Sequence, residues 1–358
     1  MNIAKIMLFC VALAFAENSL RGFAYNLYET PGAAPTIADI LQKPSDIYGH
    51  NFIYVSPASG SGYSAFDLVG GSALLGFDQS LMLGYAKNFY GLLLRISPHQ
   101  FCYRKNEDNY ECLSNENKNY IGLNFSVPLG NSILYAYTSR TTTDKYNDDN
   151  DEDIIIYKDE SSFKELYVGI TGGNMLIWDF KFGFDRRKTS FSGYGYEKYD
   201  FIPYEFNDAY YLTDAKLIFN FGYKIMQNDR LKFIVGSNNG LYCKYSSYSY
   251  YDFGMYNLQA IISPNFLGEA VLTEHLLIFA GARYSVFSEM FLFTEGYYHN
   301  KEIETFGIAN FGSEAYLGLR YERKNWAVET RLQSDAFGEI LSGNNPFASL
   351  GVFFFFQP

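Results

Sequence analysis

The sequence lacks, after residue 16, any continuous apolar run long enough to cross a bilayer as a helix, which takes about 20 residues. Its four histidines stand far apart, in no metal-ligand spacing. It also lacks a G-x-S-x-G elbow, a P-loop and a dinucleotide-binding motif. We therefore expect no transmembrane helix, no metal site, no cofactor and no enzyme. A hydrolase in the outer membrane, with catalytic residues drawn from separate strands, is kept as a minor alternative.

Basic residues are scarce relative to acidic ones. The chain has 28 Lys and Arg against 39 Asp and Glu, and removal of Lys5 with a cleaved leader would leave 27 against 39, a net charge of −12. Nucleic-acid phosphates require a basic surface, so nucleic acid is excluded as a partner. Much of the acidic excess lies in 144–160, which lacks the regular spacing of a calcium loop and predicts a solvated loop.

Residues 1–16 have the order of a secretory signal peptide. One lysine, Lys5, precedes an apolar stretch over 6–15, and the small-x-small sequence Ala14-Phe15-Ala16 precedes polar residues. The stretch is too short for a transmembrane anchor. We expect cleavage after Ala16 and export of a chain that begins at Glu17.

Aromatic residues are abundant. Tyr and Phe each occur 33 times, aromatics make up 19% of the chain, and mean hydropathy is only −0.14. Apolar residues are thus plentiful but dispersed. An exported, aromatic-rich, helix-poor chain indicates either a secreted β-sandwich or a β-barrel in the outer membrane.

Apolar and polar residues alternate in several segments, among them 175–185, 215–225, 314–322 and 326–333. Residues two apart share one face of a strand, so each segment has one apolar and one largely polar face. In a membrane barrel the apolar face meets lipid and the polar face lines the lumen. The predicted lipid-facing residues are Trp178, Phe180, Phe182, Leu217, Phe219, Phe221, Leu317 and Leu319.

Charged residues occupy the opposite faces of the same strands. They could line a polar conduit and set its solute preference, or they could pair with one another in a sealed lumen, as buried charges must. Both interpretations are kept. The lumen-lining candidates are Glu165, Asp179, Lys181, Lys216, Lys224, Lys232, Arg283, Arg320, Glu329 and Arg331.

Short and long connections alternate along the chain, which favours the barrel. Outer-membrane barrels have short periplasmic turns and longer extracellular loops, whereas a sandwich has no reason to send its long loops to one end. The predicted turns lie at 128–131, 171–174, 227–229 and 322–325, and the predicted loops at 103–118, 142–161, 188–208, 244–252, 289–312 and 335–346.

We therefore predict an all-β fold: a closed antiparallel transmembrane barrel over 63–358 with about 14 strands, 12–16 being possible. Residues 17–62 do not have the strand pattern. Pro31 to Pro35 break the chain, and one short helix is expected over Thr36–Leu41. This segment would either sit in the lumen as a plug or lie in the periplasm.

The layout of an N-terminal segment followed by about fourteen strands resembles the FadL-like (fatty-acid-transporter-like) barrel group. The resemblance rests on this layout and not on a motif, because the Asn-Pro-Ala hatch sequence of that group is absent and Ser56-Pro57-Ala58 is only loosely similar to it. The resemblance implies transport of small or hydrophobic solutes. The last strand, 348–356, with Gly351 and the aromatics Phe354 and Phe356, resembles the terminal strand that the outer-membrane assembly machinery recognises.

Cysteines give one further expectation. Cys102 and Cys112 flank a predicted loop and could form a disulfide in an oxidising periplasm. Cys243 has no obvious partner and is expected to be a small apolar residue near the rim.

Three functions remain at this point. The first is a porin-like or transporting barrel in the outer membrane, in contact with the lipid bilayer, lipopolysaccharide and the assembly machinery. The second is a non-conducting structural or surface-interaction barrel that binds glycans or a partner through tyrosine-rich loops near 194–199 and 245–251. The third is a secreted soluble β-protein.

Overall fold

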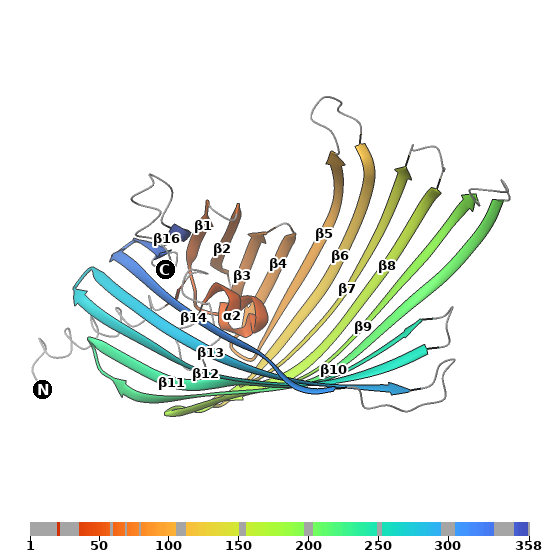
Figure 1. Cartoon of the computed structure of the whole chain (residues 1–358). Helices are drawn as coiled ribbons and strands as arrows, with labels where there is room; N and C mark the ends of the chain where they lie inside the picture. The colour runs from red at the N-terminus through yellow and green to blue at the C-terminus, as the bar shows by residue number, and fades with distance from the viewer. Residues whose placement is uncertain are drawn as a thin grey trace, which may run out of the picture.

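The computed structural model describes residues 20–21, 36–57, 60–68, 70–78, 80–104, 112–149, 155–196, 203–248, 253–294, 305–332 and 347–356. They form one closed antiparallel β-barrel of sixteen strands (Figure 1). Because the sheet closes on itself, the predicted closed barrel is confirmed and the alternative of two stacked sheets is wrong. Within the described ranges, no helix is both long and apolar enough to span a membrane.

Each strand pairs with its neighbours in the sequence, and β1 pairs with β16 to close the barrel, with Phe52 opposite Phe355. Two short helical elements, α2 (Ile37–Gln42) and the 3-10 helix η1 (Pro44–Ile47), precede the first strand. The strands are β1 (Phe52–Ser56), β2 (Ser61–Leu68), β3 (Gly71–Phe77), β4 (Leu81–Lys87), β5 (Tyr90–Arg104), β6 (Cys112–Leu129), β7 (Ser132–Asp149), β8 (Ile155–Gly172), β9 (Leu176–Tyr196), β10 (Pro203–Gln227), β11 (Leu231–Tyr248), β12 (Phe253–Thr273), β13 (Leu276–Thr294), β14 (Thr305–Arg323), β15 (Trp326–Leu332) and β16 (Phe347–Phe355).

The count of sixteen corrects the expected fourteen at two places. The sequence pattern predicts a single strand over 63–76, but these residues belong to two strands, β2 and β3, because Gly70 adopts a positive φ of 84° and turns the chain between them. The other addition is β1, which starts the barrel at Phe52 rather than at 63. Its inward residues Phe52 and Tyr54 are apolar, so β1 lacks the apolar-polar alternation of the longer strands.

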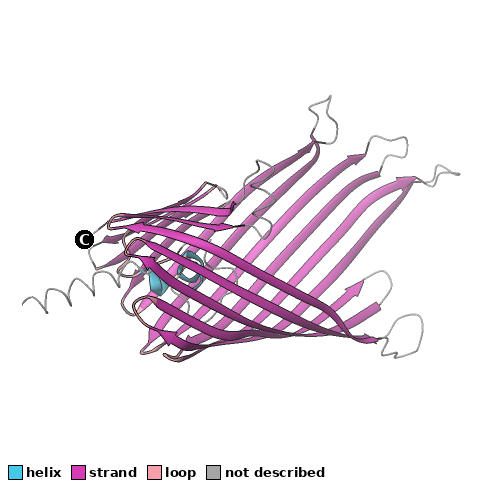
Figure 2. Cartoon of the chain, turned by 60° about the vertical axis from the view of Figure 1, so that its left-hand side comes forward, coloured by secondary structure: helices cyan, strands magenta, loops and turns pink. Residues whose placement is uncertain are grey.

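The two ends of the barrel differ in their connections. The connections after β2, β4, β6, β8, β10, β12 and β14 are two or three residues long, and we call this the short-turn end. Those after β5, β7, β9, β11, β13 and β15 are longer and lie at the opposite, long-connection end. Strands β5 to β14 have 15–25 residues, whereas β1 to β4 have 5–8, so one wall rises well beyond the other (Figures 1 and 2).

The outer surface is largely apolar. Phe180, Phe182, Leu217, Phe221 and Leu317 are exposed on it, with Phe182 at 57%, although they are large apolar side chains. The other three predicted lipid-facing residues are partly exposed on the same face: Trp178, Phe219 and Leu319. We call this surface the apolar band. A water-soluble protein rarely exposes a continuous apolar surface of this extent.

The segment before β1 lies within the ring of strands (Figure 2). Ile37, Ile40 and Leu41 of α2, together with Ile47 of η1, pack in one buried cluster with inward residues of the short wall such as Tyr54. Thr36 caps α2, because its hydroxyl accepts from the Asp39 backbone N–H while the Asp39 carboxylate accepts from the Thr36 backbone N–H. This part of the barrel interior is therefore filled by side chains.

Candidate functional site

The inner wall over β7 to β9 carries a ladder of tyrosine–carboxylate hydrogen bonds. The hydroxyl of Tyr137 donates to Glu165 Oε2 at 2.8 Å, and that of Tyr135 donates to Asp179 Oδ1 at 2.6 Å. Ser139 Oγ also donates to Glu165 Oε2, at 2.7 Å. These carboxylates thus accept hydrogen bonds from uncharged hydroxyl groups of the same wall.

A third rung of this ladder includes a cation. Lys216 on β10 forms an ion pair with Asp185 on β9 and donates to the hydroxyl of Tyr167 on β8 at 3.0 Å. Lys181 lies over the same tyrosine ring, 5.9 Å from its centroid. The wall therefore presents both signs of charge on adjacent strands.

Glycines on neighbouring strands make room for these tyrosines. Gly169 lies directly opposite Tyr135, and Gly183 lies directly opposite Tyr167. A Cβ at either glycine would overlap the tyrosine ring. The rings can therefore lie flat along the wall, which directs their hydroxyls to carboxylates on the same wall instead of into the centre of the barrel.

We call α2 together with η1 the helical segment. It is packed against the apolar inner residues of the short wall and is also hydrogen-bonded to polar inner residues. Asn124 Nδ2 of β6 donates to the carbonyl oxygen of Leu41 at 2.5 Å, and the backbone N–H of Ser45 donates to Ser126 Oγ at 2.7 Å. Gly91 of β5 faces η1 so closely that a Cβ there would collide with the backbone at Ser45. These contacts fix the segment against β5 and β6.

Two titratable groups on this segment have shifted pKa values. Burial raises the pKa of Asp46 to about 6, although the nearby cation of Lys43 opposes the shift. Burial lowers the pKa of Lys43, but the carboxylates of Asp39, Asp46 and Asp179 outweigh it, so the net shift is upward. Asp179 belongs to the tyrosine–carboxylate ladder, so the segment and the wall interact electrostatically.

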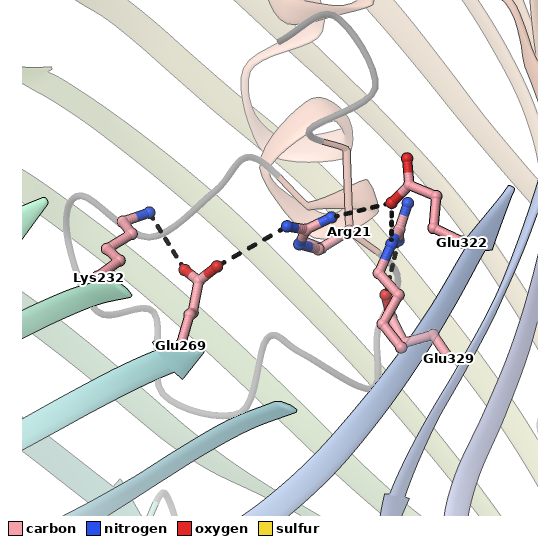
Figure 3. A network of polar contacts seen from close by, with 6 residues as sticks. Arg21, Lys232, Glu269, Glu322 and Glu329 are labelled. Atoms are coloured by element: carbon pink, nitrogen blue, oxygen red, sulfur yellow. Dashed lines mark hydrogen bonds and ion pairs between the residues drawn. The ribbon is translucent and has the colours of Figure 1, made fainter. Parts of the chain in front are cut away.

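A second network ties the segment to the opposite wall. Arg21 lies between Glu269 of β12 and Glu322 of β14, at 3.7 Å from each carboxylate (Figure 3). Glu269 also pairs with Lys232 of β11 at 3.3 Å. Residues before α2 therefore join strands that are far from β5 and β6 around the barrel.

Arg320 continues this network. Its guanidinium pairs with Glu322 at 2.8 Å and with Glu329 of β15 at 3.0 Å. Arg320 and Glu329 are both 0% exposed, and the guanidinium lies over the rings of Phe353 and Phe355 on β16. Around Arg320 the charges are therefore paired and mostly enclosed.

The ten predicted lumen-lining residues all project from the inner face, but the structure does not gather them into one site. Asp179, Glu165, Lys181 and Lys216 belong to the ladder, and Lys232, Arg320 and Glu329 to the Arg21 network. Arg283 pairs with Glu314 at 3.0 Å. Lys224 and Arg331 have no ion-pair partner among the described side chains. Whether these residues line a conduit remains a prediction.

Sequence reasoning missed the tyrosines and the residues that the N-terminal segment contributes. Tyr135, Tyr137 and Tyr167 were not candidates because tyrosine in a barrel strand more often belongs to an interfacial girdle. The positions of Tyr135 and Tyr167 opposite glycines could have indicated an inward orientation. Arg21 could not have been found, because nothing in the sequence pairs it with strands more than 200 residues away.

Two sequence predictions concern residues whose side chains lie outside the described part. The backbone register places Cys102 opposite Asn115 and Cys112 opposite Arg104, and the disulfide between them stays a prediction. The backbone of 144–149 and 155–160 belongs to β7 and β8, so the predicted loop over 144–160 is wrong for these residues, whose side chains lie outside the described part. Cys243 is a free thiol on β11 and is partly buried.

No protein-family model matches the sequence, and no curated protein matches it. Solved structures of β-barrels are similar in fold. The chain is 7% identical to the ferric-catecholate import receptor Fiu of E. coli K12, covering 81% of this chain and 50% of that one with a TM-score of 0.41. It thus spans half the length of that receptor.

Two shorter barrels cover the chain more fully. The toluene transporter TodX of Pseudomonas putida is 9% identical over 88% of this chain and 91% of its own, with a TM-score of 0.39. The translocator domain of autotransporter NalP from Neisseria meningitidis is 12% identical over 87% and 91%, with a TM-score of 0.35. Likenesses this low assign neither family nor function; the barrel is established by the strand pairing itself.

Proposed function

We propose that this chain is an outer-membrane β-barrel that passes small solutes, with the N-terminal segment restricting the lumen. The observation that carries the proposal is the inverted polarity of the closed sheet: large apolar side chains are exposed outside, and charged and tyrosine side chains lie inside. Hydrocarbon stabilises such an outer surface, and a sheet satisfies every backbone group in a bilayer only when it is closed. The short-turn end then faces the periplasm.

The helical segment supports restricted rather than free passage. It contacts β5 at Gly91 and β6 through Asn124 and Ser126, and Arg21, which is bridged to Thr36 at its start, pairs with Glu269 on the far wall. A segment held between two walls would narrow the lumen. The remaining polar wall, with its carboxylates and lysines, would favour small polar or charged solutes along β7 to β10. A hydrophobic solute, as the FadL-like resemblance implies, would instead use the apolar cluster around α2.

Planar bilayers test this proposal. The wild-type protein is expected to insert and give small conductance steps, and Gly91→Val is expected to give larger ones, because the added side chain would displace η1 from β5. Gly312→Val is the matched control, since a Cβ at Gly312 meets nothing within 4 Å. Insertion without conductance in all three proteins would contradict the transport proposal.

The alternative is a non-conducting structural or surface-interaction barrel. The fully buried Arg320–Glu329 pair and the apolar cluster around α2 favour it, because both fill the interior near the short-turn end. It predicts a closed barrel even after η1 is displaced, and glycan or partner binding at the long-connection end. We do not propose an enzymatic activity.

A further inference from the structure

Four cations lie on the outer face of β7, β8 and β9, in a chain whose net charge is −11. Arg140 is directly opposite Lys164, and Lys164 is directly opposite Arg186. Lys188 follows two residues after Arg186 on the same face, and all four side chains are exposed. We call Arg140, Lys164, Arg186 and Lys188 the basic row.

The basic row borders the apolar band. The adjacent outward residues toward the short-turn end are Leu166, 50% exposed, and Phe184, 43% exposed, which lie opposite each other. The cations thus lie at the level where the hydrocarbon core would meet the lipid head groups, on the long-connection side. Charge costs little at this depth compared with the bilayer midplane.

The basic row has no counter-charge among the described side chains. Arg186 and Lys188 lie over the ring of Tyr211, at 6.0 and 5.7 Å from its centroid, but no ion pair joins any of the four to a described carboxylate. Like charges directly opposite on neighbouring strands, about 5 Å apart, repel each other. An anion shared between the strands would remove this repulsion.

An apolar groove lies beside the basic row, on the same outer face. It has a volume of about 420 Å³, and small residues on β10 to β12 form its floor between larger side chains. Ala215, on that floor, lies two residues from Thr213, which is opposite Arg186. Its outward lining residues are Phe182, Ala215, Leu217, Leu241, Cys243, Leu258 and Ala260.

From the basic row and the apolar groove beside it, we infer a binding site for a phosphorylated glycolipid of the outer leaflet. Its phosphates would lie on the basic row and one acyl chain in the groove. The inference rests on the proposed membrane function. Arginine and lysine are the side chains that bind phosphate oxygens, arginine in bidentate geometry. Cations spread over three strands exceed what one phosphodiester needs and fit a lipid with two phosphates.

Lipid retention in nanodiscs tests the site. The protein is reconstituted in phosphatidylcholine nanodiscs with a minor fraction of bisphosphorylated lipid A, and native mass spectrometry measures the lipid A that it retains. The triple variant Arg140→Gln, Lys164→Gln, Arg186→Gln is expected to lose about a hundredfold of the preference for lipid A, since each basic residue near an anionic lipid contributes about fivefold. Arg187→Gln, on the inner face of the same strand, is the matched control and is expected to retain it.

Two further measurements separate the parts of the site. Ala260→Phe, which fills the groove, should reduce retention of lipid A while leaving its salt sensitivity unchanged. Phosphatidylglycerol should be retained less than lipid A by the wild type. The inference would be overturned if the wild type and the triple variant retained lipid A equally. It would also be overturned if the wild type retained phosphatidylglycerol as well as it retains lipid A. Failure of every variant to enter nanodiscs would instead overturn the membrane function on which it rests.

Discussion

The ring of Tyr135 lies over Gly169, its direct partner on β8, and its hydroxyl reaches past that strand to Asp179 on β9. One side chain thus spans three strands of the inner wall. The arrangement depends on the absence of a side chain at Gly169, since any Cβ would lift the ring and break its hydrogen bond.

Gly169→Val should therefore destabilise the barrel by roughly 1–3 kcal/mol, the usual cost of overpacking a close contact. The midpoint of urea unfolding in detergent, followed by tryptophan fluorescence, measures this change. Gly312→Val adds the same side chain to a strand where there is space and should leave the midpoint unchanged. If both variants unfold alike, the packing of Tyr135 on Gly169 is not a source of stability.

The buried pair of Arg320 and Glu329 gives a second prediction. Glu329→Gln leaves the Arg320 guanidinium enclosed, with Glu322 as its remaining ion-pair partner among the described side chains, and breaking a buried pair costs about 3–5 kcal/mol. The double variant Arg320→Met, Glu329→Leu, which removes both charges, should be the more stable of the two. The midpoints of urea unfolding in detergent compare the stability of the two variants. If Glu329→Gln were more stable than the double variant, the pair would not be desolvated.

Docking of the helical segment should depend on pH through Asp46. Its pKa is about 6 when docked and lies near 3.8 when the segment is free, so the docked state binds more protons between these values. Docking is therefore strengthened as pH falls from 7 to about 5 and weakened as pH rises through 6. Lys43, with its raised pKa, stays charged throughout this window.

Single-channel conductance at pH 7 and pH 5 measures this effect. The wild type should conduct less at pH 5, and Asp46→Asn should show the low conductance at both values, because its side chain carries no titrating proton. Asp39→Asn is unsuitable as a control, since Asp39 caps α2. If the conductance of Asp46→Asn responds to pH as the wild type does, Asp46 is not the group that makes docking depend on pH.

Arg21→Gln should release the start of the N-terminal segment from β12 and β14. Arg21 is largely buried, but its ion pairs with Glu269 and Glu322 are 3.7 Å long, beyond hydrogen-bond distance. We therefore expect a local loss of about 1 kcal/mol, less than the roughly 3–5 kcal/mol that breaking a close buried pair costs. Hydrogen exchange at Ile37, whose backbone N–H donates to the Arg21 carbonyl, should accelerate about fivefold while exchange in β7 to β10 is unchanged. Uniform acceleration would indicate general destabilisation instead.

The sequence predicted the barrel because its long strands alternate strictly, as β9 and β10 do around Phe182 and Leu217. It predicted β1 to β4 poorly because their inner faces pack against α2 and are apolar, so both faces look alike. The short helix expected at Thr36–Leu41 is present as α2. Its contacts across the lumen were not predictable, because hydrogen bonds such as that of Asn124 to Leu41 depend on how the closed sheet brings distant strands together.

The pairing of β1 with β16 constrains how the molecule is made. The first strand has no second neighbour until the last one is available, so the sheet stays open until residues near Phe355 have arrived. Because only a few residues separate η1 from Phe52, the helical segment is tethered at the final seam and must already be inside when the edges join. The barrel therefore closes around the helical segment, and a helical segment displaced before closure would be left outside.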